Sequence, residues 1–180
     1  IGPGPEPRRF AGEELARRRA ELIERIEPVV VAAYADVAGA QVPVTLRYDA
    51  PWRDVGLAAA LQAARPDELR RGVTLVGPHR DDLSIALDGL PSRTHSSQGE
   101  QRSLALALRL ASHRLVNEVV GSPPVLLLDD VFSELDPDRS AALLRSLPAG
   151  QTLLSTAAGL PEGVRADQVV TVTPGEVHSS

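Results

Sequence analysis

Apolar residues recur at helical spacing near the start of the chain. Between Phe10 and Ala38 they follow one helical face while Glu and Arg fill the others, and this pattern predicts an amphipathic helix. Pro28 is expected to kink this helix or split it in two, because proline removes a backbone donor and clashes with the preceding turn. Gly39 is expected to end it. Residues 1–9 hold three Pro and two Gly and are expected to form an extended lead-in.

Shorter elements follow this helix. The pattern predicts strands over 42–48, 73–76 and 83–87, and helices over 52–64 and 66–71. The break between the two helices is placed before Pro66, and Gly72 is expected to end the second one. Asp88-Gly89 is a two-residue hairpin signal, because both positions tolerate the left-handed backbone that such turns require.

The strongest apolar runs lie in the second half of the chain. Residues 104–120 are apolar almost all round, which predicts a buried helix. Residues 125–128 are all apolar and follow Gly121 and two prolines, which predicts a strand buried on both faces of a parallel sheet. A helix over 138–147 and strands over 151–156 and 169–172 complete the pattern. The expected fold class is α/β.

Composition narrows the class of protein. The 180 residues are 43% hydrophobic, which is enough for a substantial core. The chain has no Cys, so disulfides and thiolate metal sites are excluded. We expect neither a membrane span nor a secretory leader. The net charge of −5 argues against uniform electrostatic binding to DNA, and the run Arg17–Arg19 is best interpreted as a solvated helix face.

Two residue types are missing. The chain has no Met and no Lys, so all 19 of its basic residues are Arg. A P-loop has the pattern GxxxxGK[ST], in which the Lys reaches the β- and γ-phosphates. We therefore expect the chain to lack the loop that grips ATP and to be a C-terminal fragment of a longer protein.

Asp129 and Asp130 end the apolar run over 125–128 abruptly. Open α/β sheets bind their ligands at the carboxyl ends of strands. One carboxylate there can hold Mg²⁺, which prefers oxygen ligands and often bridges to nucleotide phosphates. Taken alone, the segment equally fits a core strand that runs out into a solvated turn.

Two helix starts flank this strand. Ser97 followed by Glu100 forms a capping box before an apolar run, and Gly99 permits close backbone approach. Such a helix start suits an anionic phosphate, although a purely structural cap is the simpler interpretation of this motif alone. Asp136 and Pro137 have the pattern of an N-cap and first residue of a second helix.

The segments at Ser97, Asp129 and Asp136 follow the order of the signature loop, Walker B strand and D-loop in the second half of an ABC-type ATPase head. Three segments carry a closer resemblance, and they read GPHRDDL at 77–83, SQGEQRSLALALRLA at 97–111 and VLLLDDVFSELD at 125–136. Together they closely resemble the RecF family of SMC-like ABC ATPases from Gly72 to Thr156, and the earlier residues resemble it loosely. The resemblance implies the distal half of an ABC-type (P-loop NTPase-like) head over 72–180. It also implies a mainly helical arm subdomain over 1–71.

The resemblance also implies roles for individual residues. Asp129 matches the Walker B carboxylate that holds Mg²⁺, and Asp130 occupies the position of the catalytic Glu in most ABC ATPases. Signature, D-loop and switch positions that would contact ATP are Ser97, Gln98, Gly99, Glu100, Gln101, Ser133, Asp136 and Thr156. Gln98 departs from the usual Gly, and Thr156 stands where a His is usual. For His79 in GPHRDDL, a hydrogen-bonded turn is favoured over a metal site.

The family implies a function for the intact protein. This is a weak DNA-dependent ATPase that forms a homodimer on ATP, binds junctions of single- and double-stranded DNA, and helps RecO and RecR to load recombinase in gap repair and the SOS response. A cytoplasmic, nucleoid-associated location away from membranes is expected, and this chain by itself is expected to be inactive. The alternatives are another SMC-like head or a non-catalytic interaction module. A nuclease using Asp129 and Asp130 is disfavoured, because no further acidic cluster of the needed kind stands at a strand end.

Overall fold

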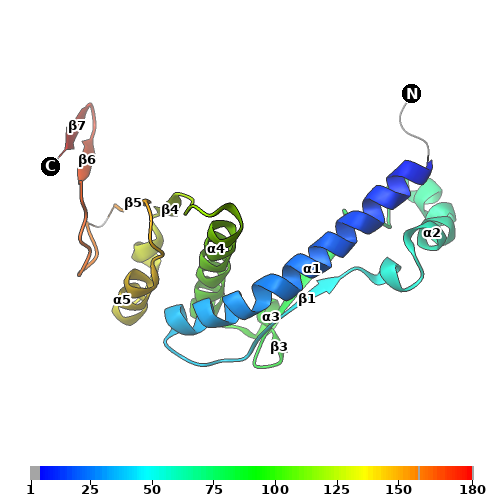
Figure 1. Cartoon of the computed structure of the whole chain (residues 1–180), viewed down its shortest axis with the longest axis horizontal. Coiled ribbons are helices and arrows are strands. Elements are labelled where there is room, and N and C mark those ends of the chain that lie inside the picture. Colours follow the sequence, from blue (N-terminus) through cyan, green and yellow to red (C-terminus); the bar gives the residue numbers. More distant parts are fainter. Residues whose placement is uncertain (1–4, 158, 180) are drawn as a thin grey trace.

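The computed structural model describes residues 5–157 and 159–179. An elongated molecule is built along the helix α1 (Pro5–Ala38), with α2 beside its first turns and α4 beside its last ones (Figure 1). The other elements, in chain order, are β1 (Val44–Asp49), η1 (Pro51–Asp54), α2 (Leu57–Arg71), β2 (Asp82–Leu87), β3 (Leu90–Pro91), α3 (Ser92–His95), α4 (Gln98–Val120), β4 (Leu126–Asp129), η2 (Val131–Glu134), α5 (Pro137–Ser146), β5 (Thr152–Ser155), β6 (Val170–Thr173) and β7 (Glu176–Ser179).

Helix α1 differs from the prediction at its start and at Pro28. Residues 5–9 are helical rather than extended, and the expectation for residues 1–4 lies outside the described residues. Prolines are tolerated in a first turn because the N–H groups there have no partner within the helix. The helix also runs through Pro28 without splitting. Tight packing on both sides, at Val30 and Ile26, outweighs the cost of about 3 kcal/mol that an internal proline carries.

The segment between α1 and β2 has fewer elements than predicted. One helix, α2, replaces the two predicted helices and contains Pro66. Pro66 and Gln62, whose carbonyl loses its partner, are exposed, so water can solvate that carbonyl. Residues 73–76 form no strand. Side chains satisfy their backbone instead: Glu68 accepts from the N–H of Leu75 at 2.7 Å, and the Arg80 guanidinium donates to the carbonyl of Thr74 at 2.7 Å.

Glycines end both helices as predicted. Gly39 follows α1 with a φ of 65°, and Gly72 follows α2 with a φ of 67°. The N–H of Gly39 donates to the carbonyl of Ala35 at 3.0 Å, and that of Gly72 donates to the carbonyl of Glu68 at 2.8 Å. Both are left-handed helix ends, which glycine adopts at little cost.

Strands β1, β2 and β3 form an antiparallel sheet in that order. The predicted turn at Asp88-Gly89 is confirmed, with φ values of 49° and 75° and Leu87 opposite Leu90. Strand β1 lies before the predicted division between residues 71 and 72, and β2 lies after it. Their pairing therefore crosses that division, which stays a prediction.

Strands β4 and β5 are parallel, with Leu126 opposite Thr152 and Asp129 opposite Ser155. The prediction of burial on both faces was wrong for this strand. Leu126 and Leu128 are 8% and 5% exposed, whereas Leu127 between them is 68% exposed. The core helices cover one face of this two-stranded sheet. Strands β6 and β7 form a separate hairpin at the far end of the molecule (Figure 1), of which β7 was not predicted.

The main core joins α1 to α4, α5, the β1–β2–β3 sheet and strand β4. Helix α4 contributes buried residues at helical spacing, namely Leu104, Ala107, Leu110, Ala111 and Leu115. Val116, Val119 and Val120 are exposed, so the expectation of a helix buried all round was wrong. The apolar run supplies one core-facing stripe, and α1 packs along it. No helix among the described residues has the length and apolar character needed to cross a membrane.

Asp81 gives the GPHRDDL segment a structural role in the fold. Its side chain is 1% exposed, and its carboxylate accepts hydrogen bonds from Nε1 of Trp52 at 2.6 Å and from the hydroxyl of Tyr48. Burial, followed by the hydrogen bond to Asp81, raises the pKa of Tyr48. Arg19 of α1 adds a cation, with Nη1 3.9 Å from Oδ2 of Asp81. The segment therefore ties α1, β1 and η1 together.

A hydrogen-bonded turn at His79 was the favoured interpretation, and it agrees with this geometry. The N–H of Arg80 donates to the carbonyl of Gly77 at 2.8 Å, which closes the turn around His79. Among the described residues there is no group of three or more His, Cys, Asp and Glu side chains that could hold a metal ion.

Candidate functional site

The start of α4 is a preorganised helix N-terminus. The Ser97 hydroxyl accepts from the N–H of Glu100 at 3.3 Å, and Oε2 of Glu100 accepts from the N–H of Ser97 at 2.7 Å. This confirms the predicted capping box. Hydrogen bonds from the Ser97 N–H and hydroxyl lower the pKa of Glu100, and the charge of Arg139 lowers it further. The N–H groups of Gln98 and Gly99 have no partner within the helix by their position, so they are available to an anion.

Gln101 has a different role from the other signature residues in this structure. Its Nε2 donates to the carbonyl of Ser96 at 3.0 Å and to that of Ser92 at 3.4 Å. The side chain thus ties α3 to the start of α4. A contact between Gln101 and a nucleotide stays a prediction. The side chain of Gln98, by contrast, is exposed to solvent.

Asp129 ends β4 beside the end of β5. Its Oδ1 accepts a hydrogen bond from the hydroxyl of Ser155, the residue opposite it in the parallel pair. Its Oδ2 accepts no hydrogen bond from the residues that the structure describes. A single carboxylate with a free oxygen fits Mg²⁺, which keeps several waters and usually takes one or two carboxylates plus substrate phosphates. Asp129 could therefore hold that ion together with a bound nucleotide.

Asp130 adopts a left-handed backbone, with φ at 48° and ψ at 27°. Few side chains adopt this conformation readily, and Asp and Asn are the main exceptions after Gly. Its N–H donates to the carbonyl of Ser155 at 3.1 Å and to its hydroxyl oxygen at 3.2 Å. The carboxylate is exposed. The turn therefore presents the carboxylate to solvent while the backbone is held against β5.

Ser155 was missed as a site residue. One hydroxyl donates to the first carboxylate of the pair and accepts from the N–H of the second. The signal was a polar residue at the end of a predicted strand. The resemblance instead pointed to Thr156, whose hydroxyl donates to the carbonyl of Gly159 at 3.2 Å. Ser155 emerges only when β4 and β5 are placed in register.

The D-loop continues from this turn. The hydroxyl of Ser133 donates to the carbonyl of Asp130 at 2.8 Å, and Oδ1 of Asp136 accepts from the N–H of Arg139 at 2.9 Å. Asp136 is therefore the N-cap of α5, with Pro137 in the first turn, as predicted. Ser133 and Thr156 both line a hollow of about 420 Å³ beside the start of α5.

The predicted residues thus fall into two groups. Asp129, Asp130 and Ser133 lie in one hydrogen-bonded turn next to β5. Ser97 begins a different helix, and no hydrogen bond or ion pair among the described residues links it to the carboxylates. Figure 1 shows β4 and β5 above α5, with α4 alongside.

Comparisons with known proteins agree on one family. No protein-family model matches the chain. The DNA replication and repair protein RecF of Frankia alni is 47% identical over 162 residues, covering 82% of this chain and 42% of that protein. RecF of Streptomyces avermitilis is 44% identical over 180 residues, covering 93% of this chain and 48% of that protein.

Solved structures give the same result. The recombination mediator protein RecF of the RecFOR pathway, solved with ATP, matches with a TM-score of 0.75 and 27% identity, over 99% of this chain and 52% of that one. A RecF structure with an ATP analogue matches with a TM-score of 0.73. The chain therefore spans about half the length of the relatives it matches.

Proposed function

Because this chain belongs to the RecF family of DNA replication and repair proteins, we propose that it forms the distal half of an ATPase head that dimerises on ATP. The observation that carries the proposal is that one chain presents two site groups of complementary chemistry. A capped helix start suited to a phosphate lies in one group, and a carboxylate pair suited to Mg²⁺ lies in the other. The chain contains no Lys and hence no P-loop.

Ser97 and the free N–H groups of Gln98 and Gly99 contact the γ-phosphate of ATP held by a second subunit. A helix of 23 residues presents the positive end of its dipole there. Ser133 and Asp136 of the D-loop, and Thr156 beyond β5, line the same interface. In this assignment, each subunit supplies one part of each composite site.

Asp129 and Asp130 divide the chemistry between them. Mg²⁺ held by Asp129 would neutralise charge on the phosphates. Asp130 accepts the proton of the attacking water as a general base. An Asp is one methylene shorter than the usual Glu, so the water sits closer to the strand end and turnover is slow.

Family membership supports a proposal for the cellular role. The protein acts in bacterial gap repair as a recombination mediator on junctions of single- and double-stranded DNA, with RecO and RecR as partners, in the cytoplasm and near the nucleoid. The support is that matched structures are recombination mediators of the RecFOR pathway. The Arg17–Arg19 run makes contacts within the chain. Arg17 and Arg18 pair with Glu14, which lowers the pKa of Glu14 to about 2, and Arg19 donates to the carbonyl of Pro78.

ATP-dependent association tests the proposal. A full-length protein that carries this segment should sediment as a monomer without nucleotide and as a dimer with Mg-ATP. The isolated segment should bind no Mg-ATP in a calorimetric titration, because it has no P-loop and its signature acts on a partner's nucleotide.

The isolated segment must be shown to be folded, by its helical circular dichroism, before its failure to bind counts. Micromolar binding of Mg-ATP by the folded segment would contradict the split-site account. A full-length protein that stays monomeric with Mg-ATP would favour a non-catalytic interaction module.

Ser155→Ala in the full-length protein should weaken its dependence on Mg²⁺. The hydroxyl orients Asp129, and loss of such an outer partner typically lowers metal affinity about 10–100-fold. The Mg²⁺ concentration for half-maximal ATPase rate should rise by about tenfold, and the rate at saturating Mg²⁺ should recover most of the parental value. Ser112→Ala is the control, because its exposed hydroxyl on α4 donates to the carbonyl of Leu108 in its own helix. An unchanged Mg²⁺ titration for Ser155→Ala would contradict the role of the Ser155 hydroxyl in orienting Asp129.

A further inference from the structure

Position 99 has no room for a side chain, because the Arg139 guanidinium occupies the space beside its backbone. It lies in the first turn of α4 with an ordinary helical backbone, not a left-handed one. A β-carbon placed there would lie 2.2 Å from Nη1 of Arg139, 3.1 Å from its Cζ and 3.2 Å from its Nη2. All three nearest atoms belong to one guanidinium. The guanidinium of α5 therefore lies directly against the backbone of the signature loop, in the space that any other side chain would take.

Arg139 is also bound to the D-loop. Its Nη1 lies 3.4 Å from Oδ2 of Asp136, and its side chain is 31% exposed. The N–H of the same residue donates to Oδ1 of Asp136. Arg139 thus contacts the N-cap Asp136 through both its backbone N–H and its side chain. Its guanidinium also lies against the backbone of Gly99. Its charge also reaches Glu100, whose pKa it helps to lower.

We propose that Arg139 is a positioning residue that holds the D-loop against the signature loop. Gly99 leaves room for the Arg139 guanidinium because it has no side chain. This role of Arg139 rests on the proposed function, in which both loops face the nucleotide of a partner subunit. Loops that move independently would have to be ordered separately at every association. Arg139 makes them one rigid unit before the partner arrives, which reduces the ordering cost of association.

The substitution Gly99→Ala distinguishes this role from a need for folding. The clashing atoms are the far end of a flexible side chain, so Arg139 can swing away and the fold survives. What is lost is the link between the two loops. Arg139→Ala removes the same link from the other side. The two substitutions should therefore have similar effects, and together they should do no more than either alone.

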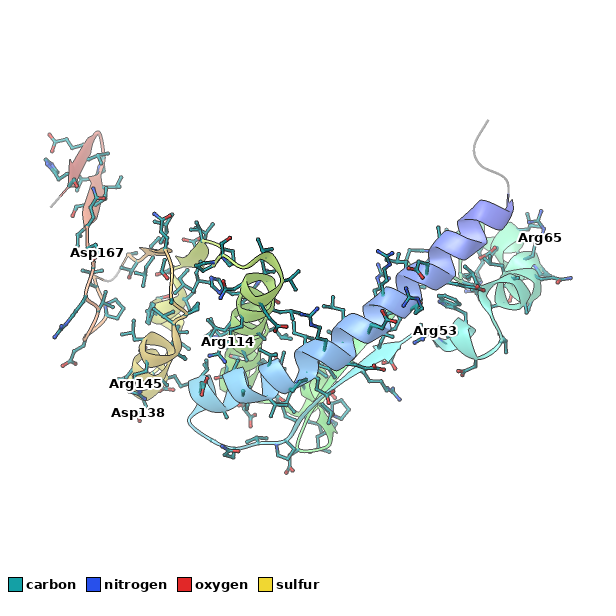
Figure 2. The ribbon with its side chains drawn as sticks, in the orientation of Figure 1. Arg53, Arg65, Arg114, Asp138, Arg145 and Asp167 are labelled. Carbon is teal, nitrogen blue, oxygen red and sulfur yellow. The ribbon has the colours of Figure 1, made fainter. Side chains whose placement is uncertain are left out.

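A double-mutant cycle in the full-length protein tests this. ATP-dependent dimerisation is measured by sedimentation for the parent, Gly99→Ala, Arg139→Ala and the double variant, with ATP binding by the monomer as the second readout. Each single variant should weaken dimerisation by about tenfold, the double variant should match the singles, and ATP binding should not change. Arg145→Ala is the control, because Arg145 is an exposed residue (Figure 2) in the last turn of α5.

Two results would overturn the role of Arg139. Parental dimerisation by Arg139→Ala would show that the link is not needed. A double variant weakened by about a hundredfold, the product of the singles, would show that Gly99 acts on the nucleotide and not through Arg139. In both cases the parent still dimerises with ATP, so the proposed function stands. A parent that does not dimerise would overturn the proposed function and this role with it.

Discussion

Asp130→Asn in the full-length protein should lower the rate of ATP hydrolysis by about 10²–10⁴-fold while sparing ATP binding, because loss of a general base typically costs this much. The amide keeps the size of the side chain but cannot accept a proton from water. Asn also tolerates the left-handed backbone at this position, with its φ of 48°, as Asp does. Asp130→Ala would be a poorer test, since a left-handed alanine carries a cost of about 1–2 kcal/mol.

Steady-state phosphate release and nucleotide binding by the monomer are the two measurements. The ATP-bound dimer should also persist longer in the Asp130→Asn protein, because hydrolysis no longer separates the subunits. Asp138→Asn, in the exposed first turn of α5 (Figure 2), should leave all three unchanged. Parental turnover by Asp130→Asn would mean that Asp130 has a structural role at the strand end and that another group activates the water.

Ser97→Arg should abolish ATP-dependent dimerisation while leaving ATP binding by the monomer intact. The new side chain adds bulk and positive charge at the helix start that faces the partner's phosphate. Loss of the cap destabilises the domain by about 1 kcal/mol, and a cation at a helix N-terminus adds about 0.3–1 kcal/mol. Domains typically have about 5–15 kcal/mol of stability, so the fold should survive.

Two further variants separate the possible causes. Ser112→Arg introduces the same side chain on an exposed face of α4, where the native hydroxyl donates to the carbonyl of Leu108 in its own helix; dimerisation should be normal. Ser97→Ala removes the cap without adding bulk and should give an intermediate loss. If Ser97→Arg dimerises with ATP as strongly as the parent, Ser97 is only a cap and the contact with the partner's nucleotide lies elsewhere.

Features that depend on neighbouring residues could be predicted from the sequence. The capping box of Ser97 with Glu100, the N-cap Asp136 and the turn at Asp88-Gly89 were all predicted and are present. Each arises from hydrogen bonds or backbone preferences within a few residues, so it can be predicted without knowing the rest of the fold. The family resemblance could be recognised from the sequence for the same reason, because the motifs that carry it are short continuous segments.

Features that depend on packing could not be predicted in this way. Proline is a local helix breaker, yet α1 and α2 both contain one because burial or solvation elsewhere along the helix outweighs the local cost. Residues 73–76 had the composition of a strand but found no strand to pair with. Strand β4 had the composition of a doubly buried strand, yet Leu127 is exposed because helices cover one face.

The contacts that complete the candidate site also come from distant segments. Ser155 reaches Asp129 through the register of two parallel strands, and Arg139 reaches Gly99 across two helices. Sequence alone determined which residues carry suitable chemical groups and which turns present them, because those are properties of short segments. Only the tertiary structure decided which of these groups meet, because contacts between distant residues depend on the packing of α1, α4 and α5 around a shared core.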